Sequence, residues 1–123
     1  MSEPVHIWVP EYHAPGNNGR GGLRRMHRWA YAKARKRAVE HLLVAGAIRH
    51  QFGTAEVRCR YTRKRRSGPE MDDDNLASSF KLIGDALETL EVVDDDKQIR
   101  LDAHQELVGR KGDWGTELIL SAG

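Results

Sequence analysis

Cysteine is nearly absent from this sequence of 123 residues, because Cys59 is the only one. A single thiol excludes a disulfide within the chain and a zinc site built from several cysteines, and it favours a reducing cytoplasm. No apolar run approaches the roughly 20 residues that span a bilayer. The first residues also lack the basic and apolar regions of a signal peptide. We therefore expect one soluble cytoplasmic domain over residues 1–123, without a membrane partner.

Acidic residues are scarce in the first half of the chain, and basic residues are scarce in the second. Residues 20–66 contain 15 of the 20 Lys and Arg but only two acids, whereas residues 67–123 contain 14 acids and five cations. Positive charge gathered in this way indicates a polyanionic partner such as a nucleic acid. Two solvated faces that attract each other would be the plainer interpretation. The charge distribution alone leaves both open.

Hydrophobic periodicity predicts six elements in the order strand, helix, strand, helix, strand, strand. The predicted strands cover residues 5–10, 54–65, 98–108 and 115–121, and the predicted helices cover residues 23–46 and 74–90. In the second helix, apolar side chains repeat at helical spacing from Leu76 to Leu90. This order is typical of a small α/β domain with a mixed sheet.

Two runs of three aspartates flank the second predicted helix. Asp72 to Asp74 open it, and Asp94 to Asp96 follow it. Helix capping needs only one carboxylate, and a solvated turn would account for the second run. Adjacent carboxylates also supply the oxygen ligands that Mg²⁺ takes in enzymes that hydrolyse phosphodiesters. Neither run has the glycine and glutamate of an EF-hand loop, which excludes that kind of calcium site.

Lys81 is the only cation in residues 67–96. On a helix it shares a face with Asp74, Ser78 and Asp85. An ion pair with Asp85 one turn away would give it a structural role. Next to a bound metal it would instead contact a phosphate or stabilise a leaving group. The spacing favours neither role.

Basic side chains crowd the first helix and the second strand, with Trp29 and Tyr31 among them. Such density fits contact with a phosphate backbone, but it carries no base-reading information. The candidate DNA-binding residues here are Arg24, Arg25, Arg28, Arg63, Lys64, Arg65 and Arg66.

The stretch MDDDNLASSFKLIGDALETLEVVDDDKQI resembles the signature of the RusA family of endodeoxyribonucleases, the Holliday junction resolvases of phages and prophages. The residues that carry the resemblance are Asp72, Asp74, Asn75, Leu76, Lys81, Asp85, Ala86, Leu87, Asp95, Asp96 and Gln98. A first strand that ends in proline, a loop with Asn17 and Asn18, a basic helix and the closing KGDWGTELIL are also similar, in the same order. The resemblance therefore spans nearly the whole chain and adds this asparagine pair to the DNA-binding candidates.

The resemblance implies a small α/β homodimer that cuts branched DNA, such as a four-way junction, in recombination or repair. The cofactor would be Mg²⁺, with Mn²⁺ as a substitute, and the location would be the cytoplasm of a bacterial host carrying a phage or prophage. The implied catalytic residues are Asp72, Asp74, Asp96 and Lys81, and the implied metal ligands are Asp72, Asp74, Asp95 and Asp96. The family's usual spacing would put its lysine at Ser78, whereas alignment on Asp85-Ala86-Leu87 puts it at Lys81.

The length of the second helix conflicts with a metal site that joins both aspartate runs in one chain. A straight helix over residues 74–90 is about 25 Å long. Either the chain doubles back, or the second run comes from another subunit, because antiparallel helices in a two-fold dimer bring one start near the other end. We favour active sites shared between subunits. Trp8, Val92 and Val93 are candidates for the dimer surface or for the core.

Two other functions remain open at this stage. A DNA-binding or regulatory protein without catalytic activity would use the basic helix and strand, and its aspartates would be caps and turns. A less selective nuclease would cut flaps or RNA.

Overall fold

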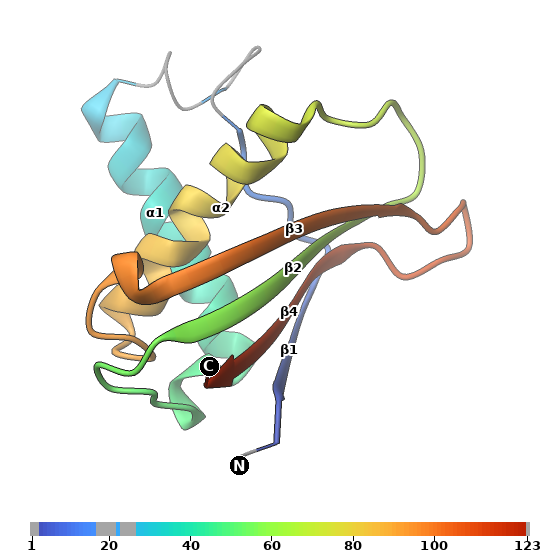
Figure 1. Cartoon of the computed structure of the whole chain (residues 1–123). Helices are drawn as coiled ribbons and strands as arrows, with labels where there is room; N and C mark the ends of the chain where they lie inside the picture. Colours follow the sequence, from blue (N-terminus) through green and yellow to red (C-terminus); the bar gives the residue numbers. More distant parts are fainter. Residues whose placement is uncertain (1–2, 17–21, 23–26, 123) are drawn as a thin grey trace.

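Four strands and two long helices follow one another in the predicted order. The computed structural model describes residues 3–16, 22 and 27–122. The strands are β1 (Val5–Pro10), β2 (Val57–Arg65), β3 (Ile99–Leu107) and β4 (Gly115–Ala122), the long helices are α1 (Arg28–Val44) and α2 (Asp73–Thr89), and the 3-10 helices are η2 (Ala47–Arg49) and η3 (Asp96–Gln98). The predicted small mixed α/β domain is thereby confirmed (Figure 1).

The strands form one mixed sheet with the spatial order β1-β4-β2-β3. β4 runs antiparallel to both of its neighbours, and β2 runs parallel to β3. Parallel neighbours need a crossover connection, and α2 provides it. Both long helices lie on the same side of the sheet (Figure 1). Because the spatial order begins with β1 and ends with β3, these two are the edge strands.

The alternation of side chains in β2 explains why one face of the sheet is covered. Val57, Cys59 and Tyr61 are buried on the side of the helices, whereas Arg58 and Arg60 are exposed on the open face. This is the apolar and basic alternation that the sequence predicts.

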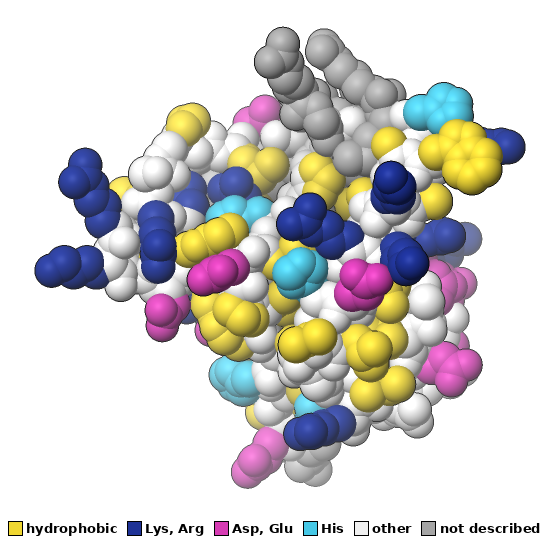
Figure 2. Space-filling model, turned by 180° about the vertical axis from the view of Figure 1, so that it is seen from behind, with side chains coloured by type: hydrophobic (Ala, Val, Ile, Leu, Met, Phe, Trp, Pro, Cys, Tyr) yellow, Lys and Arg dark blue, Asp and Glu magenta, His cyan; other side chains and the backbone are white. Residues whose placement is uncertain are grey.

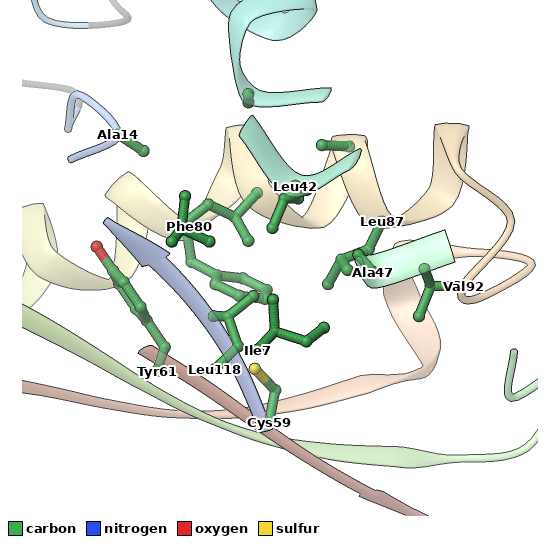
Figure 3. Close-up of a cluster of buried hydrophobic side chains, with 14 of the residues drawn as sticks. Ile7, Ala14, Leu42, Ala47, Cys59, Tyr61, Phe80, Leu87, Val92 and Leu118 are labelled. Atoms are coloured by element: carbon green, nitrogen blue, oxygen red, sulfur yellow. The ribbon is translucent and has the colours of Figure 1, made fainter. Parts of the chain in front are cut away.

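The core lies between the sheet and the two helices. Figure 3 shows side chains from β1, β2, β4, α1 and α2 converging there, among them Ile7, Tyr61 and Leu42. The hydroxyl of Tyr61 lies 2.8 Å from that of Ser79, so these buried polar groups satisfy each other. Burying this apolar surface is the main favourable term in folding.

The two helices contribute very differently to this core. α2 buries eight residues against the sheet, whereas α1 buries only Ala38 and Leu42. α1 ends near the predicted stop, where Gly46 has a φ of 86°. The first residues of its predicted range, 23–26, lie outside the described part of the chain. Within the described ranges, neither helix has the length and apolar character to cross a membrane.

Candidate functional site

The first acidic run begins α2. The side chain of Asp72 accepts a hydrogen bond of 2.7 Å from the backbone N–H of Asn75, which makes it the N-cap. Asp73 and Asp74 occupy the first turn and are exposed. Their charges favour the positive end of the helix dipole. One aspartate therefore has a structural role as a cap, and the other two are accessible to a ligand.

The second acidic run follows a sharp reversal of the chain after α2. Glu91 has a φ of 61°, and the next residues, Val92 and Val93, are 0% and 1% exposed. These two valines therefore belong to the core, which settles the question that the sequence left open. Asp95 then caps η3, where its carboxylate accepts a hydrogen bond of 2.9 Å from the N–H of Lys97. The buried valines fold the second run back along α2.

The reversal brings three carboxyl groups together. Oxygens of Asp85, Glu88 and Asp96 all lie within 4.8 Å of one another. Asp85 and Glu88 are one turn apart on α2, and Asp96 begins η3. Asp96 packs beside Gly84 of α2, where a Cβ built on the glycine would lie 3.6 Å from the Cβ of Asp96, an ordinary contact distance. We call these three residues the acidic cluster.

The crowding in the acidic cluster changes how readily its members lose a proton. Burial, the hydrogen bond with Asp95 and the charge of Asp85 raise the pKa of Asp96. Desolvation and the charges of Asp96 and Asp95 raise the pKa of Glu88. We attribute the second shift mainly to the charges, because this side chain is exposed. A cation among these groups would relieve the repulsion.

The two acidic runs do not meet within one chain. Asp96 lies beside Gly84, ten residues after Asp74, so about 15 Å of helix separates the first run from the second at 1.5 Å per residue. The sequence left two alternatives, a chain that doubles back and a second run that comes from another subunit. The chain does double back, but not far enough to join the two runs. Asp72 and Asp74 stay with the start of α2, and Asp95 and Asp96 stay near its last turns.

Lys81 and Ser78 lie between the two runs. The ammonium group of Lys81 is 5.6 Å from the ring centre of Tyr31 on α1, a cation–π distance. The Tyr31 hydroxyl donates a hydrogen bond of 2.7 Å to Asp85, and burial followed by this bond raises its pKa to about 12. The hydroxyl of Ser78 donates to the carbonyl of Asn75. Lys81 and Asp85 of the acidic cluster therefore both contact Tyr31.

Tyr31 links the acidic cluster to the basic helix. The exposed cations of α1 are Arg28, Lys33, Arg35, Lys36 and Arg37. Most of the Lys and Arg side chains visible in Figure 2 lie in the upper half of that face. The candidates Asn17, Asn18, Arg24 and Arg25 lie outside the described residues.

The four cations from Arg63 to Arg66, three at the end of β2 and one just after it, are presented in different ways. Lys64 lies 3.6 Å from Glu117 and 3.8 Å from Glu106, so acids already neutralise it. Arg65 is only 8% exposed, and its Nε donates to the carbonyl of Gly68. Arg66 is exposed, and Arg63 is partly buried. Among these four candidates for DNA contact, Arg66 is thus the most accessible.

Aromatic and basic side chains line a hollow of about 510 Å³ beside α1. Lys33 and Arg37 form one wall, and Tyr12, His13 and Trp114 form another part of it. The rings of His13 and Trp114 meet edge to face at 4.9 Å. Rings beside cations are the surface on which unpaired bases stack in proteins that bind single strands.

Sequence reasoning missed Glu88 and Tyr31 and did not commit to Asp85 as a ligand. The i, i+3 spacing of Asp85 and Glu88 was the available signal, because such residues share a helix face. No pattern pointed to Tyr31, whose contact with Asp85 joins residues 54 apart in the chain. A scan of the chain against protein-family models matched none of them, and a search of curated proteins found no match.

Proposed function

We propose that this protein is a Mg²⁺-dependent, structure-selective endodeoxyribonuclease that resolves Holliday junctions and related branched DNA by hydrolysing phosphodiesters. The observation that carries the proposal is the acidic cluster, whose oxygens lie within 4.8 Å of one another, held against the basic helix α1 through the bond of 2.7 Å between Tyr31 and Asp85. Nucleases need both features together, because cations hold the DNA backbone and carboxylates hold the metal.

The geometry of the acidic cluster fits Mg²⁺. This ion takes oxygen ligands at about 2.0–2.1 Å in an octahedron, so opposite ligands lie about 4.2 Å apart. Neighbouring ligands of the octahedron lie about 2.9 Å apart. The three carboxyl groups, whose oxygens lie within 4.8 Å of one another, would therefore have to turn toward the ion to bind it together. Asp85 is already oriented by Tyr31, and such support from a second residue tunes a metal ligand. A bound Mg²⁺ would activate water and neutralise charge on the phosphate.

The chain's own groups divide the remaining work. Asp85, Glu88 and Asp96 would hold the ion, and Asp95 would keep Asp96 in place through their hydrogen bond. Lys81, whose ammonium group lies 5.6 Å from the ring centre of Tyr31, would contact a phosphate oxygen and balance the charge that builds up there. The exposed cations of α1 would bind the flanking backbone without reading bases.

Asp72 and Asp74 would complete the active site from a second subunit. They are too far along α2 to join the acidic cluster of their own chain, and Asp74 is exposed. A homodimer also matches the substrate, because a four-way junction has two-fold symmetry and needs two cuts. Each subunit would give its first acidic run to one site and its acidic cluster to the other.

Cleavage of a labelled four-way junction tests this function. We expect cleavage with Mg²⁺ or Mn²⁺, none with EDTA, and weaker cleavage of duplex, flap and RNA substrates of the same length. Binding without cleavage under any divalent ion would overturn the proposal and favour a DNA-binding or regulatory role. Equal cleavage of flaps or RNA would contradict junction selectivity and leave a less selective nuclease.

A further inference from the structure

The hollow beside α1 has the size of a site for a small ligand. Its volume of about 510 Å³ falls within the range of about 300–1,000 Å³ that is usual for such sites. Trp114, His13 and Pro15 line it and are only partly buried, so part of their surface is accessible from inside the hollow. A flat ring system can therefore lie against apolar and aromatic surface here.

Hydrogen bonds hold the aromatic wall of the hollow in place. The backbone N–H of Glu11 donates to the carbonyl of Trp114 at 3.0 Å. The buried hydroxyl of Thr116 donates to the carbonyl of Tyr12 at 2.7 Å. Nε2 of His13 donates to a backbone carbonyl of β2 at 2.7 Å. A ligand that enters the hollow therefore meets a wall that is already ordered, which reduces the entropic cost of binding.

The opposite wall of the hollow is positively charged. Lys33 and Arg37 lie one turn apart on α1, and both are exposed. Neither cation takes part in an ion pair with another described residue. Glu11 is the only acid among the described residues of the lining, so the cations outnumber it. The hollow thus joins an aromatic surface to a site for an anion, which are the two parts that a nucleotide needs.

We propose that the hollow binds one unpaired nucleotide of a DNA strand. The base stacks on Trp114 beside His13, and the phosphate binds Lys33 and Arg37. A paired base cannot enter in this way, because its faces are covered by the neighbouring bases of the duplex. Unpairing costs least at a base that is mismatched or already single-stranded. The hollow therefore selects branched DNA that has an unpaired nucleotide beside the branch point.

The position of the hollow connects it to the first acidic run. The segment that follows β1 leads from the hollow to α2, where a Cβ built on Gly16 would overlap the side chain of Asn75. The backbone N–H of Asn75 in turn bonds to Asp72. Three residues separate His13 from Gly16, a distance of at most about 11 Å. A strand with a nucleotide in the hollow thus passes close to the first acidic run, a step that rests on the proposed function because it places that run in the active site.

Binding of DNA in EDTA tests the hollow without any cleavage. The probes are a single-stranded oligonucleotide and a duplex of the same sequence at the same salt concentration. Trp114→Ala should weaken single-strand binding at least about fivefold, the lower value for the loss of one base stack, and leave duplex binding unchanged. Trp114→Phe keeps a ring and should restore most of the affinity. Trp29→Ala is the matched control, because Trp29 is 70% exposed on α1 and lies outside the hollow.

Two lysines of α1 give an independent comparison that does not disturb the core. Lys33 lines the hollow and Lys36 does not, and both are exposed. Each alanine substitution removes one positive charge, so both should weaken duplex binding to a similar extent. Only Lys33→Ala should weaken single-strand binding further. Equal losses of single-strand binding in the two variants would overturn the assignment of the phosphate.

A fluorescent base shows directly whether a nucleotide enters the hollow. We place 2-aminopurine, whose emission falls when it stacks, at an unpaired position beside the branch point of a junction, or in a paired arm. The wild type should quench the first probe and leave the second unchanged, and Trp114→Ala should quench neither.

Absence of quenching beside the branch point, or an equal effect of Trp29→Ala and Trp114→Ala, would overturn the nucleotide site. Cleavage of junctions by a protein that fails these tests would still support the proposed function. Quenching by a protein that never cleaves would support the nucleotide site and contradict the function.

Discussion

The two acidic runs of this protein are similar in sequence but have different surroundings. The first is exposed, and one of its members caps α2. The second is folded against α2 by two buried valines, where burial, the hydrogen bond with Asp95 and the charge of Asp85 raise the pKa of Asp96. Two similar sequence segments therefore have different physical roles. The first run stabilises a helix and remains accessible to a partner. The second places Asp96 beside two other carboxylates, which repel one another unless a cation lies between them.

The largest expected effect separates metal ligands from neighbouring acids. Asp96→Asn removes a member of the acidic cluster, and we expect junction cleavage to fall at least 100-fold, since even residues that only support metal ligands cost about 10- to 100-fold. Asp94→Asn is the matched control, because Asp94 is exposed and outside the cluster. Single-turnover cleavage measures both. Equal loss in the two variants would contradict the assignment of the cluster.

The next largest effect concerns the stability that the first run provides. Asp72→Ala removes the N-cap of α2 and should lower the free energy of unfolding by about 1 kcal/mol. Asp73→Ala loses only a favourable interaction with the helix dipole. It should therefore lower the free energy of unfolding by less than Asp72→Ala does, within or below the range of about 0.3–1 kcal/mol. Urea unfolding gives both values. A larger loss at residue 73 would show that Asp72 is not the cap in solution.

A smaller effect is expected where the basic helix meets the acidic cluster. Tyr31→Phe removes the hydrogen bond to Asp85 but keeps the ring near Lys81. Such a bond has a net value of about 0.5–1.5 kcal/mol, so cleavage should fall roughly threefold to tenfold. Junction binding measured in EDTA should stay unchanged. Weaker binding with unchanged cleavage of bound DNA would place Tyr31 in the DNA interface instead.

The smallest effect is a gain of stability. The raised pKa of Asp96 means that the folded state holds this proton more tightly than the unfolded chain does. Stability therefore decreases as the pH rises from about 4 through the raised pKa. Asp96→Asn should be more stable than the wild type at pH 7 by a few tenths of a kcal/mol, about the value of partly exposed charges, with no difference below about pH 3. Unfolding midpoints of both proteins at the two pH values test this prediction. An Asp96→Asn variant that is less stable than the wild type at pH 7 would contradict it.

Much of the fold follows from local sequence patterns. The stripe from Leu76 to Leu90 predicted residues 74–90 as a helix, and α2 covers Asp73–Thr89. The alternation in β2 likewise predicted its buried and basic faces. These periodicities record which side of an element faces the core, so one sequence is enough to find them.

The site was less predictable because it depends on contacts between distant residues. The turn after α2 folds back because Val92 and Val93 reach the core, and this reversal selects Glu88 as a neighbour of Asp96. Tyr31 reaches Asp85 only after α1 packs on α2. The assignments of Asp72, Asp74, Asp95, Asp96 and Lys81 remain predictions. Those of Asp72 and Asp74 now depend on whether a partner brings the two runs together.

Mixing two inactive variants tests most directly whether two chains share each active site. A heterodimer of Asp74→Asn and Asp96→Asn subunits has both lesions in one shared site and none in the other. A heterodimer of the wild type with the doubly substituted chain is the control, because sharing leaves neither of its sites intact. We predict junction nicking by the first heterodimer and none by the second. Nicking by the second and none by the first would contradict the account and show that each chain builds its own site.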